Sequence, residues 1–471
     1  MAGARTPLTV LLLAAGQGTR LKSKTIKLLH PVAGQPMVTW VARAAQALRP
    51  KLSVAVVGFQ GDRVQESLAG LCDTFVVQAE QRGTGHAVMQ AAGALRGARG
   101  PVLIVNGDLP NLTAETLRAL VALQRKSKAA LALVTTDVPD PTGYGRIVRD
   151  AKNRVLSIVE HKDATAEQRR ITEINCGIYC ADPAVLMASL KKIRPDNAQG
   201  EYYLTDAVHA LIAKGETVVA LKHAAHEEVL GVNTRAELAA AGAMLYARKA
   251  VALQDAGVTL LDASRTWIDP RAKVGRDTVF YPDVLVEGAS VIGEDCILRS
   301  GSRLANMVLG RGVEVKDHCV LQDSKIGDDA QLGPFAHLRP GSILEAKARV
   351  GNFVELKKTR LGKGSKAPHL AYLGDAEIGP GCNIGAGTIT CNYDGVHKHK
   401  TAMGPGVFIG SDTQLVAPVT IGEGAYVAAG TTVTTDVPPG ALAISRTRQL
   451  NLEGWVSRRK QKTAGAGTSH S

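Results

Sequence analysis

The stretch AAGQGTR combines small residues and positive charge in a pattern that could bind phosphate. Its glycines, Gly16 and Gly18, let backbone N–H groups approach a phosphate chain closely. Arg20 and Lys27 follow and could neutralise a polyphosphate leaving group. The stretch is not a Walker loop, because no GK[ST] follows, and Leu21 stands where the dinucleotide fingerprint requires its third glycine. We interpret it as a loop that holds a phosphate chain.

The apolar run Leu8–Ala15 ahead of this loop has two interpretations. With Arg5 before it, the run resembles a signal peptide. It could equally be a buried strand that leads into the glycine loop. Removal of a signal peptide would take away the first strand of the fold, so we favour the strand.

The elements that must position this loop are alternating strands and helices. The runs LTVLLLAAG, LSVAVVG, PVLIVNGDLP and LALVTT are typical of buried parallel strands, and Met37–Leu48 of a helix between them. They predict a doubly wound, Rossmann-like α/β domain over residues 1–234. An alanine-rich stretch predicts a linker helix over 235–255.

After about residue 262, apolar residues recur every six positions and glycine often follows them. This period fits neither one helix nor one strand, but it fits a β-helix with one inward residue per flat face. We therefore predict a column of parallel strands over residues 256–471. The inward positions are predicted to be Ile268, Val274, Phe280, Val286, Ile292, Leu298, Leu304, Val320, Ile326, Leu332, Leu338, Leu344, Val350, Leu356, Met403, Ile409, Leu415, Ile421, Val427 and Val433.

Two segments depart from this period. Cys391–Ala402 (CNYDGVHKHKTA) interrupts it and predicts a loop on one face. The loop is either a tolerated surface insertion or an arm that reaches a neighbouring chain, and we favour the arm. The tail from Arg446 is basic and ends in small polar residues, which predicts disorder.

Composition narrows the class of protein. The 471 residues are 45% hydrophobic and 21% charged, and no apolar run approaches the length of a membrane span. The seven cysteines form no CxxC pair, which favours a reduced, cytoplasmic chain. The net charge of +13 fits phosphorylated substrates or a nucleic acid. Because aromatic residues are only 4%, few stacking platforms exist, and we do not expect nucleic acid as the main partner.

Several motifs occur together in one order: LAAGQGTR, KLLHPVAGQPM, QAEQRGTGHA, NGDLP, GYGRIV, EHKDA, EINCGIY, EYYLTD and GNFVELKKTRLGKGSKAPHLAYLGDAEIG. With the six-residue repeats, they cover nearly the whole chain. The sequence resembles the bacterial bifunctional N-acetylglucosamine-1-phosphate uridylyltransferase/glucosamine-1-phosphate acetyltransferase family. The resemblance implies acetyl transfer from acetyl-CoA in the second half, then uridylyl transfer from UTP in the first.

The resemblance also implies the residues of the first site. Asp108 and Asn233 match a Mg²⁺ pair, although a helix cap after a strand would also explain Asp108. Gln78, Gly83 and Thr84 match uracil contacts, and Gly145, Glu160 and Asn175 match contacts to N-acetylglucosamine. The implied UTP and product site comprises Ala14, Ala15, Gly16, Gly18, Lys27, Gln78, Gly83, Thr84, Asn106, Gly107, Asp108, Gly145, Glu160, Asn175 and Asn233, with Arg20 and Lys27 catalytic.

Two departures from the family pattern concern fine specificity. The run SKTIK places Lys24 and Ile26 where an acidic residue and a proline are common. Asn106 stands where some members have tyrosine. The metal aspartate and the lysine are kept, so we expect activity to survive.

For the second site, the resemblance implies that His369 is the general base, because an attacking amine must lose a proton. A lone histidine is otherwise usually structural. Implied sugar-phosphate contacts are Arg339, Lys357, Tyr372 and Asn383. Implied acetyl-CoA or sugar contacts are Ala386, Asn392, Tyr393, Ser411, Ala429 and Arg446. Members of the family are trimers with a left-handed column and a second site shared between chains.

Three hypotheses follow. The first is an enzyme with both activities, whose product is a precursor of bacterial envelope glycans. The second keeps one active half and uses the column as a trimer scaffold. The third, a nucleic-acid binder, predicts binding that falls steeply with salt.

Overall fold

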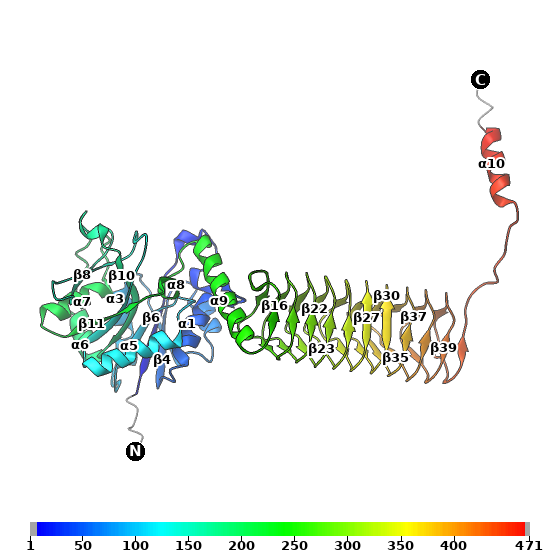
Figure 1. The fold of residues 1–471 in the computed structure, drawn as a ribbon, viewed down its shortest axis with the longest axis horizontal. Coiled ribbons are helices and arrows are strands. Elements are labelled where there is room, and N and C mark those ends of the chain that lie inside the picture. The colour runs from blue at the N-terminus through cyan, green and yellow to red at the C-terminus, as the bar shows by residue number, and fades with distance from the viewer. Residues whose placement is uncertain (1–6, 467–471) are drawn as a thin grey trace, which may run out of the picture. The chain divides into compact units, whose positions relative to one another are not determined.

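The computed structural model describes residues 7–466. The chain divides into two compact units between Arg248 and Lys249 (Figure 1). The helix α9 (Arg235–Asp255) contains this division. The domain limits at 234 and 256 stay predictions.

The first unit is built on one mixed sheet. Its strands lie in the order β11 (Val218–His223), β7 (Leu131–Asp137), β10 (Glu173–Ala181), β6 (Val102–Asn106), β1 (Thr9–Ala14), β4 (Leu52–Val57) and β5 (Thr74–Val77). β8 (Arg146–Arg149) and β9 (Val155–Val159) form a hairpin attached to β10. The apolar run before the glycine loop is β1, which pairs in parallel with β4 and β6. It is therefore a central strand of the fold.

Helices cover both faces of this sheet, as a doubly wound fold requires. They are α1 (Met37–Gln46), α2 (Gly61–Ser67), α3 (Thr84–Gln90), α4 (Ala92–Leu95), α5 (Ala114–Ser127), α6 (Pro183–Leu190), α7 (Leu204–Ala213) and α8 (His226–Val229). Val10 and Leu12 of β1 join one core with α1, α2 and α5. Leu11 joins the opposite core with α3, α6 and α7. Alternate residues of one strand thus serve the two layers.

β10 runs antiparallel between β6 and β7. The sequence predicted parallel strands and did not predict this one. β10 is buried on both faces, so its residues show no alternation that would reveal its direction. Because it runs opposite to β6, its early residue Asn175 lies toward the edge where β1 and β6 end.

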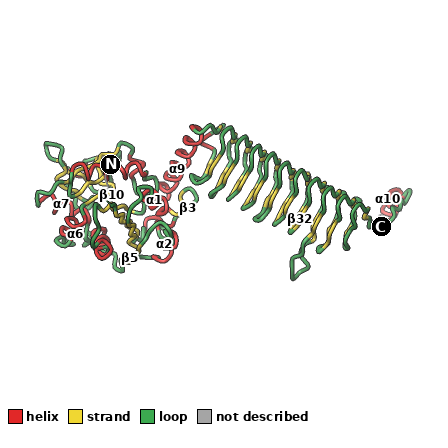
Figure 2. Tube along the Cα trace, turned by 90° about the horizontal axis from the view of Figure 1, so that it is seen from below, coloured by secondary structure: helices red, strands yellow, loops and turns green. Residues whose placement is uncertain are grey.

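The second unit is a column of three parallel sheets, as predicted (Figure 2). The first face comprises β12 (Thr259–Leu260), β15 (Val279–Phe280), β18 (Ile297–Leu298), β21 (Glu314–Val315), β24 (Gln331–Leu332), β27 (Arg349–Asn352), β30 (Lys366–His369), β33 (Asn383–Ile384), β36 (Phe408–Ile409), β39 (Tyr426–Val427) and β41 (Leu442–Ala443). The second comprises β13 (Trp267–Ile268), β16 (Leu285–Glu287), β19 (Arg303–Ala305), β22 (Val320–Gln322), β25 (His337–Leu338), β28 (Glu355–Lys357), β31 (Tyr372–Gly374), β34 (Ile389–Cys391), β37 (Gln414–Val416) and β40 (Thr432–Val433). The third comprises β14 (Lys273–Val274), β17 (Val291–Ile292), β20 (Val308–Leu309), β23 (Lys325–Ile326), β26 (Ile343–Leu344), β29 (Arg360–Leu361), β32 (Ala376–Ile378), β35 (Thr401–Met403) and β38 (Val419–Ile421).

The predicted inward residues fill the interior of the column, with one error. Val320 is 37% exposed, and its neighbour Leu321 is buried instead. Val286 pairs with Leu304, which lies 18 positions later in the chain. Leu304 pairs with Leu321, which lies only 17 positions later. A coil that is one residue shorter shifts the six-residue count, and this explains the error. Val274 is only partly buried.

The predicted insertion lies between β34 and β35. Leu361 pairs with Ile378, 17 positions later in the chain. Ile378 pairs with Met403, 25 positions later, because the insertion adds residues between them. The loop folds on itself through an antiparallel bridge between Tyr393 and Lys398. Its reach toward a neighbouring chain stays a prediction.

The basic tail carries a helix, α10 (Trp455–Ala466), where the sequence predicted disorder. The Arg459 guanidinium lies 5.0 Å from the Trp455 ring centroid, a contact local to this helix. Residues 467–471 lie outside the described residues. Across residues 7–466, none of the helices combines the length and apolar character of a membrane span.

Candidate active sites

Four polar side chains meet at the carboxyl edge of the first sheet. Lys27 begins the short helix η2 (Lys27–Leu29), and its Nζ lies 2.6 Å from Asp108 Oδ2 and 3.1 Å from Asn233 Oδ1. Arg20 Nη2 donates to the same Asn233 oxygen at 2.8 Å. Two cationic groups therefore converge where β1 and β6 end, which is the usual ligand edge of an open α/β sheet.

A divalent cation fits the donor set at this edge. Asp108 and Asn233 offer two hard oxygens, and both already attract the Lys27 ammonium. Between residues 7 and 466, no cluster of three or more His, Cys, Asp or Glu side chains could hold a metal by itself. A cation here would thus take its other ligands from substrate phosphates and water, as Mg²⁺ commonly does.

A cavity of about 320 Å³ opens beside these residues. The predicted residues that line it are Ala15, Gly16, Lys27, Gln78, Gly83, Thr84, Asn106, Gly107 and Asp108. Gln81 also lines the cavity, although it was not among the predicted site residues, and it donates from Nε2 to the Ala15 carbonyl at 2.7 Å. Gln81 thereby fixes the start of the glycine loop, and its place in QAEQRGTGHA was the available signal.

The two predicted uracil contacts are held against each other. Gln78 Nε2 donates to the Gly83 carbonyl at 3.1 Å. Gly83 has φ +100°, and a Cβ there would lie 2.6 Å from the Tyr202 carbonyl oxygen. Only glycine suits this position, because both the backbone conformation and the space exclude a side chain.

A second hollow of about 180 Å³ adjoins the first through shared lining residues. The predicted residues that line it are Thr84, Asn106, Asp108, Gly145, Glu160, Asn175 and Asn233. The two hollows share Thr84, Asn106 and Asp108. The predicted nucleotide and sugar contacts therefore lie on the two sides of Asp108.

Polar groups in the second hollow are prepared for hydrogen bonding. Burial raises the pKa of Glu160, and a hydrogen bond from Thr205 Oγ1 at 3.1 Å opposes that rise. Burial also raises the pKa of Tyr144 to about 12, so its hydroxyl stays a donor at neutral pH. Asn175 Nδ2 donates to the Tyr179 hydroxyl at 2.6 Å. Thr205 and Tyr144 were missed as site residues, although both belong to motifs already noted.

Three predicted residues do not line either hollow. Ala14 is buried at the end of β1, and Arg20 is exposed but reaches Asn233. Gly18 has φ +67°, and a Cβ there would lie 2.3 Å from Lys27 Cβ. Gly18 therefore allows Lys27 to approach the loop.

The SKTIK departure is accommodated by Gln60. Its Nε2 donates to the Lys24 carbonyl at 2.9 Å, and its Oε1 accepts from the Ile26 N–H at 3.1 Å. Ile26 is buried in the core next to η2. The backbone before Lys27 is thus fixed without the proline that is common in the family.

In the column, His369 ends β30 and lies beside Asn352, which ends β27. His369 Nδ1 is 2.7 Å from Asn352 Oδ1. A carbonyl oxygen only accepts, so Nδ1 carries the proton and the Nε2 lone pair is free to take another. This is the tautomer that a general base requires.

The residues predicted to bind acetyl-CoA extend from His369 along one corner. Pairing of β30, β33, β36 and β39 places Ala386, Ser411 and Ala429 in the three coils after His369. Arg446 Nη1 donates to the Ala429 carbonyl at 3.0 Å. A line of small residues that ends in a guanidinium suits an elongated ligand with a phosphorylated end.

A polar cluster occupies the neighbouring face. Lys357 Nζ lies 3.4 Å from Asp375 Oδ2, and the Asn392 amide donates to the same oxygen at 2.5 Å. A Cβ on Gly374 would lie 2.5 Å from the Tyr372 hydroxyl and 2.8 Å from Asn392 Nδ2. Gly374 therefore lets these two predicted residues meet.

Lys398, in the insertion, joins this cluster and was missed as a site residue. Contact with the Lys357 ammonium lowers the pKa of Lys398. Two like charges placed side by side favour binding of an anion. The signal in the sequence was the density of Lys and His at the tip of the insertion.

The remaining predicted residues lie near the same coils. Arg339 follows β25 and pairs with Glu355 at 3.0 Å. Asn383 begins β33 and pairs in register with Lys366. The Tyr393 hydroxyl donates to the Gly395 carbonyl inside the insertion, so Tyr393 stabilises the loop in this structure.

Comparisons with known proteins match different families to the first and second units of the chain. Residues 10–175 match the MobA-like NTP transferase domain, residues 263–363 the GMPPB C-terminal domain, and residues 400–435 six bacterial transferase hexapeptide repeats. Proteins called bifunctional protein GlmU are similar over almost the full length. That of Geobacillus thermodenitrificans is 49% identical over 96% of this chain and 98% of its own. That of Pelobacter propionicus is 49% identical over 96% and 99%, and that of Listeria monocytogenes 47% over 95% and 97%.

A likeness of this extent, together with an NTP transferase domain and a hexapeptide column, establishes the family. The chain belongs to the GlmU family of bifunctional enzymes, with a uridylyltransferase in its first unit and an acetyltransferase in its second.

Proposed function

We propose that the enzyme makes UDP-N-acetylglucosamine in two steps. The second unit transfers acetyl from acetyl-CoA to glucosamine-1-phosphate, and the first unit then transfers uridylyl from UTP to the product. The observation that supports this most is the Lys27 ammonium between Asp108 and Asn233, beside a cavity lined by the predicted nucleotide contacts.

In the uridylyl step, a phosphate oxygen of the sugar attacks the α-phosphorus of UTP. A P–O bond forms between the sugar phosphate and the α-phosphorus. The bond from the α-phosphorus to the oxygen that bridges it to the β-phosphorus breaks, and pyrophosphate leaves. This chemistry depends on alignment and charge neutralisation more than on a protein nucleophile. Lys27 and Arg20 would leave Asp108 and Asn233 for the phosphates as charge moves to the leaving group.

Asp108 and Asn233 would hold a Mg²⁺ ion in this step. An ion held there would supply positive charge that neutralises the charge of the substrate phosphates. Gln78 and Gly83 would hold the uracil. Glu160 would accept hydrogen bonds from the sugar, and Asn175 would donate them to it. The pocket residues thereby align the two reacting phosphates.

In the acetyl step, the sugar amine attacks the thioester carbonyl, and His369 Nε2 accepts its proton. The C–N bond forms, the C–S bond breaks, and the departing thiolate takes up the proton from His369, so that coenzyme A leaves as a thiol. Arg339, Lys357 and Lys398 would bind the sugar phosphate, and Arg446 would bind the coenzyme's phosphates.

The substrates favour a cytoplasmic enzyme, where UTP and acetyl-CoA are available. The seven cysteines are all free, as in a reducing compartment. The product would supply precursors for the bacterial cell envelope.

The test follows thiol release and pyrophosphate release as separate signals, with one substrate omitted at a time. We expect thiol without UTP, and pyrophosphate only with acetyl-CoA or preformed N-acetylglucosamine-1-phosphate. If pyrophosphate appears only with the preformed acetylated sugar, the column is a scaffold. If neither signal appears, the proposed substrates are wrong.

Asn352 should control the pH dependence of acetyl transfer through His369. Asn352→Leu removes the acceptor of the Nδ1 proton, and we expect kcat/KM to fall about tenfold. Asn352→Asp places a carboxylate beside Nδ1, which stabilises the protonated ring. We therefore expect the acidic limb of the kcat/KM profile to move up by about one pH unit, measured by thiol release from pH 5 to 9. An unmoved limb in the Asp variant would exclude this contact from catalysis.

We also propose that the enzyme is a homotrimer whose chains meet at an apolar corner beside His369. Phe335, Phe353 and Leu370 occupy this corner in successive coils, with Phe353 57% and Leu370 61% exposed. All three have positive φ, at 55°, 56° and 44°. Left-handed backbone costs a bulky residue about 1 kcal/mol relative to glycine, so these residues are unfavourable in an isolated chain. Burial against another chain would offset that cost.

Phe353→Asp tests the trimer. Aspartate already occupies left-handed corners at Asp323 and Asp329, so we expect the variant chain to fold with unchanged stability. Its mass by light scattering should fall from three chains to one, thiol release should fall at least about 100-fold, and pyrophosphate release should stay within twofold. Val308→Asp, on another face of the column, should change none of these. A trimer in the Phe353 variant would disprove this interface.

A further inference from the structure

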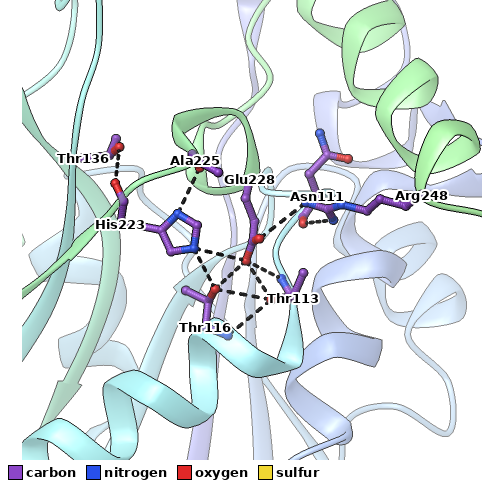
Figure 3. A network of polar contacts seen from close by, with 8 residues as sticks. All are labelled: Asn111, Thr113, Thr116, Thr136, His223, Ala225, Glu228 and Arg248. Carbon is purple, nitrogen blue, oxygen red and sulfur yellow. Dashed lines mark hydrogen bonds and ion pairs between the residues drawn. The ribbon is translucent and has the colours of Figure 1, made fainter. Parts of the chain in front are cut away.

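A mostly buried carboxylate, Glu228, lies outside both hollows and has no role in either proposed reaction. It belongs to the one-turn helix α8, and its side chain is 13% exposed. Its Oε1 accepts from the Thr113 N–H at 3.3 Å, the Thr113 hydroxyl at 2.7 Å and the Thr116 hydroxyl at 2.5 Å (Figure 3). Its Oε2 lies 3.5 Å from Arg248 Nη2. Its Oε1 also lies 3.8 Å from His223 Nε2 of β11, so Glu228 joins four separate parts of the chain.

The contacts of Glu228 are not required to cap the neighbouring helix α5. Thr113 is the N-cap of α5, and its own hydroxyl accepts from the Thr116 N–H at 3.2 Å. The helix is thus capped without Glu228. Arg248, from α9, uses its second nitrogen to donate to the Asn111 carbonyl at 2.5 Å. This bond holds the loop before α5 and not the helix itself.

Two short segments connect this cluster to the predicted metal ligands. The loop from Asp108 to Thr113 runs from the carboxylate to the threonine that Glu228 binds. The segment from Glu228 to Asn233 runs from the cluster to the amide. The Val232 N–H donates to the Asp108 carbonyl at 2.9 Å, so the segments also contact each other near the ligands.

The approach of these segments is close. A Cβ on Gly231 would lie 3.2 Å from Asp108 Oδ2. The backbone of the 228–233 segment therefore packs directly against the Asp108 carboxylate. Loops without a regular hydrogen-bond ladder depend on such fixed points for their position. Loss of the cluster would free both ligands at once.

We propose that Glu228, together with Arg248, is a positioning residue that sets the separation of the Asp108 carboxylate and the Asn233 amide for a divalent cation. This inference rests on the proposed uridylyl transfer. Glu228 touches neither substrate nor cation in this role, and acts through the two segments that it joins.

The test compares Glu228→Gln, Arg248→Met and a control in the full chain. The glutamine amide turns a donor toward Arg248, which should displace that guanidinium from the Asn111 carbonyl. Arg248→Met removes the guanidinium and keeps all three bonds from the threonines. Glu227→Gln is the matched control, because Glu227 is the preceding residue of α8, is exposed and contacts only His226 among the ion pairs of the described residues.

The main readout is binding of Mn²⁺ in the presence of UTP, followed by electron paramagnetic resonance. We expect affinity for Mn²⁺ to fall about tenfold in both variants, the size typical when residues behind metal ligands are changed. Pyrophosphate release should recover to within twofold of the parent at saturating Mg²⁺. Thiol release, measured on the same chain, should not change, and the Glu227 variant should match the parent throughout.

Unchanged Mn²⁺ affinity in both variants overturns the inference. So does a loss of pyrophosphate release that Mg²⁺ does not restore while Mn²⁺ affinity is normal, because that pattern marks a purely structural role. If Glu228→Gln does not fold, Arg248→Met decides. If the parent chain binds Mn²⁺ with UTP but releases no pyrophosphate, the proposed reaction fails, and a loss of Mn²⁺ affinity in the variants still supports the positioning role.

Discussion

Asp108→Asn should abolish pyrophosphate release and leave thiol release unchanged. The substitution keeps the shape of the side chain but removes the Asp108 carboxylate, which Lys27 contacts at the carboxyl edge of the sheet. It also leaves the protein with only neutral amide oxygens at positions 108 and 233 to offer the proposed cation. Metal-assisted charge neutralisation is worth several kcal/mol in the transition state, so we expect kcat to fall at least about 1,000-fold. Pyrophosphate release with N-acetylglucosamine-1-phosphate, UTP and Mg²⁺ measures the loss.

Asp137→Asn provides the control for this experiment. Asp137 is an exposed aspartate of the same unit that pairs with Lys222, and its loss should change neither signal by more than about twofold. Loss of thiol release in the Asp108 variant, with the fold intact by circular dichroism, would contradict independent sites. Normal pyrophosphate release would remove Asp108 from the reaction.

The framework of the first unit could be predicted because its strands are local apolar runs. β1, β4, β6 and β7 each carry a continuous buried segment between turn residues. The direction of β10 could not be predicted in this way. A strand buried on both faces reads alike in either direction, and only its partners β6 and β7 reveal that it is antiparallel.

The column was predictable for a different reason: each coil repeats the same inward position. The error at Val320 marks the limit of counting, because the step from Leu321 to Ile326 is one residue shorter than six and Leu321 takes the inward place. The sequence period alone does not reveal such a shift of the inward position. The shift becomes visible only when the residue that pairs with it in the adjacent coil is known. Leu304 of the previous coil supplies that information here.

The candidate sites were predicted residue by residue through family resemblance, and the structure adds residues that only proximity could reveal. Lys398 lies 41 positions after Lys357 in the chain, yet their ammonium groups interact. Glu228 is an ordinary helix carboxylate by its sequence, and its value lies in contacts with Thr113 and Thr116. Residues that act through others leave no spacing pattern of their own.

His369→Ala should have the opposite effect to Asp108→Asn. The imidazole ends β30 with Nδ1 held by Asn352, so its loss removes the group oriented to take the amine proton. General base catalysis contributes about 100- to 10,000-fold, and we expect kcat for thiol release to fall within that range. Pyrophosphate release from preformed N-acetylglucosamine-1-phosphate should stay within twofold of the parent.

The pH profile of the residual activity distinguishes a base from a mere binding contact. Without His369, the part of the acidic limb that comes from protonation of the imidazole should disappear, and only the part from protonation of the substrate amine should remain, with water then accepting the proton. His337→Ala is the control, since His337 also lies on the column, half exposed beside Glu355. If the pH profile of the His369 variant matches that of the parent and only the affinity for glucosamine-1-phosphate falls, the ring binds substrate, and another group on the corner accepts the proton.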